Sequence, residues 1–268
     1  MNPTRIQDCF NSLAKNGKKG FVAYVCAGDP GLKQTVDIVL RLEDAGADIV
    51  ELGVPFSDPL ADGPVNQQAS ARALAAGATV DGVLNCVSAI RKSSEIPLIL
   101  FTYLNPIYAY GYERITRRAA SVGVDGFLTL DLPVEESAEY VDCLRKRHLD
   151  NVFLVAPTST DARIRHTANA ASGFVYCVSR EGVTGMQKKL GGSAVDLLRR
   201  TRRHTSLPIA LGFGVSTPAQ ARAAVAHAEA VVVGSAIVDR FHRAPHTAAG
   251  RSKAAKWVRS LVRAVKEV

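Results

Sequence analysis

Eight short apolar runs recur along the chain, and amphipathic helical patterns separate each run from the next. The runs are rich in β-branched and aromatic residues, which is typical of buried strands. They lie at 21–26, 48–53, 97–103, 126–130, 152–156, 174–178, 208–211 and 230–233. Strands that alternate with helices form parallel sheets, and eight such units without an obvious edge strand indicate a closed barrel. The sequence therefore predicts an α/β fold, a (β/α)8 TIM barrel with an extra N-terminal helix, around Arg5 to Leu13, at its floor.

The length and composition of the chain fit one such barrel. The chain has 268 residues, of which 47% are hydrophobic and 22% charged, and a (β/α)8 barrel needs about 250. No linker rich in Pro, Ser or Gly divides the sequence, so we expect a single domain over residues 1–268. Gly46 is placed to end a helix, the segment 217–220 (Thr-Pro-Ala-Gln) to begin one, and the apolar spacing from Ala254 to Val265 predicts a last amphipathic helix.

Several classes of protein are disfavoured by the composition. No apolar run approaches the roughly 20 residues that span a bilayer, and the N-terminus lacks an apolar signal core, so we expect a soluble, cytoplasmic protein without membrane contact. The five cysteines are odd in number and form no Cys-x-x-Cys, which argues against a disulfide framework or a zinc site. The net charge is +8, but aromatic residues do not accompany the basic clusters, so no nucleic-acid partner is expected.

The segment from Glu51 to Pro64 carries two acids in and just after a predicted strand. An unpaired glutamate is costly to bury, and a desolvated carboxyl tends to keep its proton, as a general acid requires near neutral pH. Glu51 is therefore a candidate catalytic residue. Asp62, where the following loop closes, is the second candidate, although an aspartate there could equally cap a helix or form an ion pair.

Chemistry in such a barrel takes place where the strands end, and these ends carry a restricted set of side chains. No lysine stands there, which argues against a Schiff base, and none of the six histidines does, which argues against a metal site. We therefore expect an acid–base reaction without metal or cofactor.

Two glycine-rich turns follow the last two predicted strands, at 212–214 and 234–236. Uncovered backbone amides beside a helix start favour a phosphate, and barrels often bind phosphate in these two units. The segment 179–192, with four glycines around Thr184, is typical of a lid loop over an active site.

Together these motifs resemble those of the tryptophan synthase α-subunit family. The Glu51 to Pro64 segment matches the family signature almost residue for residue, and the resemblance covers nearly the whole chain. Further matching motifs follow in the family's order: 28–30 (Gly-Asp-Pro), 105–107 (Asn-Pro-Ile), 131–133 (Asp-Leu-Pro), 180–185 (Arg-Glu-Gly-Val-Thr-Gly), 212–214 (Gly-Phe-Gly) and 234–236 (Gly-Ser-Ala).

The resemblance implies a reaction and a role for each matching residue. The reaction is the retro-aldol cleavage of indole-3-glycerol phosphate to indole and glyceraldehyde 3-phosphate, with Glu51 as the general acid–base and Asp62 as the carboxylate that holds the indole N–H. The remaining matches are implied to bind substrate: Gly185, Gly214, Gly234 and Ser235 around the phosphate, Thr184 on the lid against Asp62, Tyr176 beside Glu51, and Tyr24, Tyr103 and Phe213 around the indole.

The family also implies a partner, a pyridoxal-phosphate-dependent tryptophan synthase β subunit in an αββα heterotetramer. The residues matching the family's contact face are expected on loops at the barrel mouth: Pro55, Phe56, Asp58, Asn105, Pro106, Asp131 and Pro133. Three positions depart from the family pattern without removing a catalytic group, namely Tyr24, Val65-Asn66 and the lid pair Lys188-Lys189.

Three alternatives stay open at this point. The chain could be a regulatory subunit that activates the β subunit without cleaving substrate, a stand-alone lyase that releases indole, or another phosphate-binding barrel such as a sugar-phosphate isomerase. The intact Glu51 and Asp62 disfavour the first, and the Glu51 to Pro64 segment disfavours the last.

Overall fold

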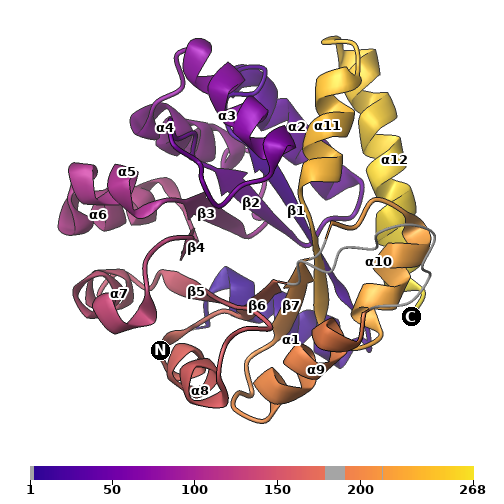
Figure 1. Ribbon diagram of the computed structural model, residues 1–268. Coiled ribbons are helices and arrows are strands. Elements are labelled where there is room, and N and C mark those ends of the chain that lie inside the picture. The colour runs from indigo at the N-terminus through magenta and orange to yellow at the C-terminus, as the bar shows by residue number, and fades with distance from the viewer. Residues whose placement is uncertain (1–2, 179–190, 213) are drawn as a thin grey trace.

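Eight parallel strands pair in chain order and close into a barrel, as the sequence predicted (Figure 1). The computed structural model describes residues 3–178, 191–212 and 214–268. The strands are β1 (Gly20–Cys26), β2 (Ile49–Gly53), β3 (Leu98–Thr102), β4 (Gly126–Thr129), β5 (Asp150–Val155), β6 (Val175–Val178), β7 (Ile209–Gly212) and β8 (Ala230–Val233). Each begins and ends within two residues of its predicted run, and β8 pairs with β1 to complete the ring.

Helices connect the strands and surround the barrel. Those before β4 are α1 (Arg5–Lys15), α2 (Leu32–Asp44), α3 (Pro64–Ala75), α4 (Val80–Ile90), α5 (Leu104–Tyr110) and α6 (Tyr112–Val122). Those after β4 are the 3-10 turn η1 (Val134–Glu136), α7 (Ala138–Arg145), α8 (Asp161–Ala170), α9 (Gly192–Arg202), α10 (Pro218–Val225), α11 (Ser235–Arg243) and α12 (Ala248–Lys266).

The predicted helix boundaries are confirmed where the sequence gave explicit signals. Gly46 follows α2 with φ at 99°, a left-handed conformation that favours glycine. Thr217 caps α10 and forms a capping box with Gln220. The α12 side chains at three- and four-residue spacing, among them Val258, Leu261 and Val265, are buried against the barrel.

Both faces of the strands are apolar because one faces the barrel interior and the other faces the helices. Val22, Ile49 and Phe174 belong to the interior cluster, whereas their neighbours along each strand pack outward. The extra helix α1 closes the end of the barrel at which the strands begin, here called the floor. Its Phe10 enters the interior cluster and lies 5.7 Å from Phe174 between ring centroids, which confirms the predicted floor helix.

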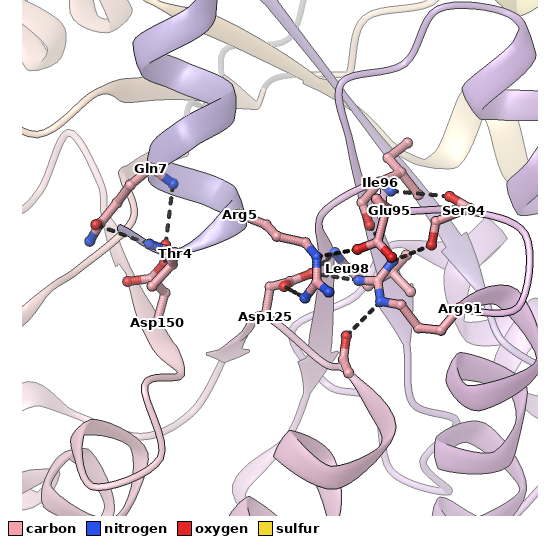
Figure 2. A network of polar contacts seen from close by, with 11 residues as sticks. Thr4, Arg5, Gln7, Arg91, Ser94, Glu95, Ile96, Leu98, Asp125 and Asp150 are labelled. Atoms are coloured by element: carbon pink, nitrogen blue, oxygen red, sulfur yellow. Dashed lines mark hydrogen bonds and ion pairs between the residues drawn. The ribbon is translucent and has the colours of Figure 1, made fainter. Parts of the chain in front are cut away.

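Polar side chains at the floor form a network of contacts in two groups, one around Asp125 and one around Thr4 (Figure 2). Asp125, just before β4, accepts hydrogen bonds from Arg91 (2.6 Å), Arg5 (2.9 Å) and the backbone amide of Leu98 (2.7 Å). The Thr4 hydroxyl, at the N-cap of α1, donates to Asp150 at the start of β5. These contacts fasten α1 to three successive strand beginnings.

Among the described residues, no single helix is both long and apolar enough to cross a membrane. The pair α3 and α4 passes that test only when the two are joined across their 95° bend. All five cysteines carry free thiols.

Candidate active site

Glu51 points into the barrel near its mouth, the end at which the strands finish. Side chains alternate along a strand, and Ile49, two residues earlier on β2, belongs to the interior cluster. Glu51 therefore lies in the next interior layer of the barrel, at a position where the pattern would place an apolar residue. The sequence placed this acid at the end of its strand; it lies two residues before that end.

The Glu51 carboxyl has no compensating partner within residues 3–178, 191–212 and 214–268. The side chain is 0% exposed, and neither carboxyl oxygen accepts a hydrogen bond from any described residue. Burial alone raises the pKa of Glu51 from its ordinary 4.5 to about 8. The carboxyl is therefore mostly protonated at neutral pH, which makes Glu51 a ready proton donor.

Asp62 lies in a different environment. It is half-buried and follows the loop after β2, just before Gly63 caps α3. Tyr103 Oη donates to Asp62 Oδ2 at 2.9 Å, and Asn66 Nδ2 donates to Asp62 Oδ1 at 3.3 Å. Burial raises the pKa of Asp62, while these two hydrogen bonds act in the opposite direction by favouring the charged form.

Three tyrosines lie around the two carboxyls: Tyr103, which bonds Asp62, and Tyr24 and Tyr176. Tyr24 on β1 lies opposite Glu51 in the β1–β2 register, and Tyr176 projects from β6. Burial raises the pKa of both tyrosines well above the ordinary value, and the charges of Glu51 and Asp62 add to this. Because the charges of both carboxyls raise the pKa of the same two tyrosine hydroxyls, all four groups belong to one site.

Two strand-end glycines leave room for these tyrosine rings. A Cβ atom on Gly53 would lie 2.3 Å from Tyr24 Oη, and one on Gly212 would lie 2.2 Å from Tyr176 Oη. Neither position tolerates a side chain unless the tyrosine moves. Tyr24 also packs edge-on against Phe101, with 4.9 Å between ring centroids, so the site wall is well packed.

The predicted phosphate residues lie at the ends of β7 and β8. Gly234 is the N-cap of α11 and Ser235 is its first residue. The amides of Ile237 and Val238 already donate to Gly234 O, so the amides of Ser235 and Ala236 are the ones at this helix start that can receive an anion. Gly214 is exposed and has φ at 70°, a conformation that favours glycine. These three residues offer backbone donors suited to an anion. Thr184, Gly185, Phe213 and the predicted lid lie outside the described residues.

One expectation about the mouth loops was wrong. Asn105 and Pro106 belong to the short helix α5 rather than to a loop. Tyr103 caps α5, and Asp131 fixes its start by accepting a hydrogen bond from the Leu104 amide at 2.6 Å. Pro55, expected at a contact face, is buried.

The sequence did not reveal how Asp62 is held. Tyr103 was expected only as an indole-pocket wall. Its hydroxyl also donates a hydrogen bond to Asp62 and accepts one from the Ala61 amide at 3.0 Å. Asn66 was noticed only as a departure from the family pattern. Its spacing of four residues from Asp62, at the start of a helix, was the available signal.

The arrangement separates two carboxyls by environment. Glu51 is desolvated and holds a proton. Burial also raises the pKa of Asp62, but two hydrogen bonds oppose that rise by favouring its charged form. Such a pair can donate a proton at one point of a substrate and stabilise positive charge at another.

Comparison with known proteins agrees with this geometry. A family model described as "Tryptophan synthase alpha chain" matches residues 10–267. The chain is 48% identical over 238 residues to the tryptophan synthase alpha chain of Geotalea uraniireducens (89% of each chain), and 46% identical over 260 residues to that of Solibacter usitatus (97% of each).

Solved structures give the same result. The crystal structure of tryptophan synthase subunit alpha from Legionella pneumophila superposes with a TM-score of 0.91 at 33% identity, with all of both chains covered. An open form of tryptophan synthase from M. tuberculosis superposes with a TM-score of 0.88 at 31% identity, covering 98% of each chain. With sequence, barrel and family model in agreement over almost its whole length, the chain belongs to the tryptophan synthase alpha chain family.

Proposed function

We propose that Glu51 and Asp62 carry out the acid–base chemistry of this family, the cleavage of indole-3-glycerol phosphate to indole and glyceraldehyde 3-phosphate in tryptophan biosynthesis. The single observation that carries the proposal is the buried, unpartnered Glu51 carboxyl, whose raised pKa keeps a proton available. The chain is a lyase, and these residues are its proposed catalytic pair.

The reaction follows from the two environments. Glu51 donates its proton to C3 of the indole ring, and Asp62 accepts a hydrogen bond from the indole N–H and stabilises the resulting cation. The Glu51 carboxylate then removes the proton of the side-chain hydroxyl next to the ring. The C–C bond breaks, its electron pair restores the indole ring, and the hydroxyl carbon becomes the aldehyde.

The proposed phosphate site lies at Gly214, Gly234 and Ser235, where backbone donors and the N-terminus of α11 favour an anion. Tyr24, Tyr103 and Tyr176 are the proposed substrate-contacting rings. We expect Thr184, Gly185 and Phe213 to complete the site, as the family resemblance implies.

The partner is a tryptophan synthase β subunit, with which the alpha chain forms an αββα heterotetramer. We propose docking at the mouth through the exposed residues Asp58, Asn105 and Asp131. Two large side chains lie near them: Leu60, 81% exposed, on the loop that carries Asp58, and Tyr108, 72% exposed, on the helix that carries Asn105. They supply the apolar contact of this docking face. Alanine at Asp58 or Asn105 should weaken activation by β; unchanged affinity and activation would place docking elsewhere.

We also propose that the chain forms one domain and works in the cytoplasm. Its role in tryptophan biosynthesis and its five free thiols support this location.

The test is the release of glyceraldehyde 3-phosphate from indole-3-glycerol phosphate, with and without a β subunit. Glu51→Gln keeps the shape of the side chain but cannot donate a proton as an acid, and we expect a loss of about 10³-fold or more. Glu95→Gln, at an exposed carboxylate of the floor, is the matched control. Full activity in Glu51→Gln would contradict the assigned role, and turnover without β equal to that with β would indicate a stand-alone enzyme.

A further inference from the structure

Asn66 lies beside Asp62 on the first turn of α3 and is not among the residues assigned to the reaction. Its Nδ2 donates to Asp62 Oδ1 at 3.3 Å, while Tyr103 Oη donates to Asp62 Oδ2 at 2.9 Å. The two carboxylate oxygens are thus held from two different elements, α3 and the end of β3. The role argued for Asn66 rests on the proposed role of Asp62.

The amide of Asn66 has one favourable orientation. If its oxygen rather than its nitrogen faced Asp62, two acceptors would meet and repel. The side chain therefore acts as a donor to the carboxylate, and it favours the charged form of Asp62.

Packing alone does not explain an asparagine at this position. Asn66 Oδ1 is buried and finds no donor among the described residues, and an unsatisfied buried acceptor destabilises a fold. Val65, the residue before Asn66, and Ala69, three residues after it, belong to an apolar cluster with Tyr24 and Cys26. A leucine at this position would bring no unsatisfied acceptor.

We propose that Asn66 is a positioning residue: together with Tyr103 it fixes the plane of the Asp62 carboxylate and keeps it charged before the substrate arrives. The catalytic contact with the substrate remains that of Asp62. Asn66 acts only through this carboxylate.

The other ionisable groups that face Asp62 determine the sign of the effect. Tyr103 lies at the end of β3, Tyr24 and Cys26 on β1, and Tyr176 on β6; Glu51 on β2 shares the same site. None of these described groups is a cation, so no positive charge among them replaces the lost amide. Removing the Asn66 donor therefore raises the pKa of Asp62.

The direct test is a ¹³C NMR titration of the Asp62 carboxyl in the whole protein, with the resonance assigned by its loss in Asp62→Asn. In Asn66→Leu we expect the titration midpoint of Asp62 to rise by roughly half a pH unit to one pH unit, the size of one ordinary hydrogen bond, because at 3.3 Å this contact is long. The acid limb of the pH profile of kcat/KM, measured with the β subunit, should move by the same amount.

The matched control is Gln67→Leu. The Gln67 amide also bonds Asp62, but at its backbone oxygen (2.9 Å), and so it should leave the midpoint unchanged. Asn66→Gln, which keeps the amide, should restore most of the wild-type midpoint. An unchanged midpoint in Asn66→Leu would overturn the proposal, as would an equal shift in Gln67→Leu.

A stability measurement separates positioning from structural support. We expect the Tm of Asn66→Leu to equal or exceed that of the wild type, because the buried unpaired acceptor is removed. A fall in Tm with no change in the titration would assign Asn66 a merely structural role. Full activity in Asp62→Asn would instead contradict the proposed function, while the NMR result on Asn66 would stand.

Discussion

The floor and the mouth of the barrel both contain a buried carboxyl, but they treat it in opposite ways. At the floor, Asp125 accepts hydrogen bonds from two arginines and a backbone amide. At the mouth, Glu51 has no hydrogen-bond partner among the described residues. Burial raises the pKa of both groups, yet only at the floor do nearby cations and donors oppose that effect. The floor carboxyl is stabilised by its partners, whereas the mouth carboxyl keeps a proton in a costly place, as the proposed role of Glu51 as a proton donor requires.

The largest expected effect on stability is at the floor. Asp125→Ala would leave Arg91, whose side chain is 10% exposed, buried without its carboxylate partner. We expect a loss of about 3 kcal/mol in the free energy of unfolding, typical of breaking a buried pair. Urea denaturation measures it, with the exposed Asp58→Ala as control. A loss below that of the control would show that the floor network contributes little.

At Glu51 the comparison predicts the opposite of the loss expected at Asp125: removing this carboxyl should increase the free energy of unfolding, by an amount that depends on pH. Between pH 4.5 and about 8 the folded chain keeps a proton on Glu51 that the unfolded chain releases, so this group lowers stability as the pH rises. Glu51→Gln has no such proton. We therefore expect its advantage in unfolding free energy over the wild type to grow from pH 5 to pH 8, as measured by urea denaturation at each pH. A constant difference across this range would mean that the pKa of Glu51 is not raised.

A smaller effect is expected where the site wall is tightly packed. Gly53→Ala would place a methyl group 2.3 Å from Tyr24 Oη and force the ring to shift. We expect a loss of about 1–3 kcal/mol in stability and a higher KM for indole-3-glycerol phosphate, measured by denaturation and by steady-state kinetics.

Gly63→Ala is the matched control for this substitution. A Cβ atom on Gly63 meets nothing within 4 Å, and its φ of −76° suits any residue. If both variants behaved alike, the packing of Tyr24 against Gly53 would not constrain the site.

The smallest effect concerns the attachment of α1. Thr4→Val removes both the helix cap and the hydrogen bond to Asp150, and we expect a loss of about 1–2 kcal/mol. Thr79 caps α4 through its hydroxyl alone, so Thr79→Val should cost less, and the difference between the two measures the Asp150 contact. Equal losses would show that this contact adds nothing at the floor.

The sequence predicted the periodic parts of the fold because their signals are local. Each strand run was placed to within two residues, and the Thr217 capping box and the Gly46 helix end were found from residue type and spacing. The helix α5 was missed because Asn105-Pro106 reads as a turn, whereas in the structure proline occupies a tolerated position in the first turn of a helix.

The sequence proposed members for the candidate site but did not indicate the contacts between them. Glu51, Asp62 and the glycines of the last two units were found because their residue types stand out against an apolar pattern. The hydrogen bonds of Tyr103 to Asp62 and of Arg91 to Asp125 join residues 41 and 34 positions apart, and no local pattern encodes them.

By itself, the sequence determined that this chain forms a (β/α)8 barrel, that it belongs to the tryptophan synthase alpha chain family, and which acids stand near the strand ends. Hydrophobic periodicity and motif spacing are properties of neighbouring residues, so they can be read along the chain. Only the tertiary structure decided that, in the part of the chain that is described, Glu51 has no hydrogen-bond partner while Asp62 and Asp125 do. The pKa of a carboxyl depends on burial and on donors brought from distant strands, and those exist only once the barrel has closed.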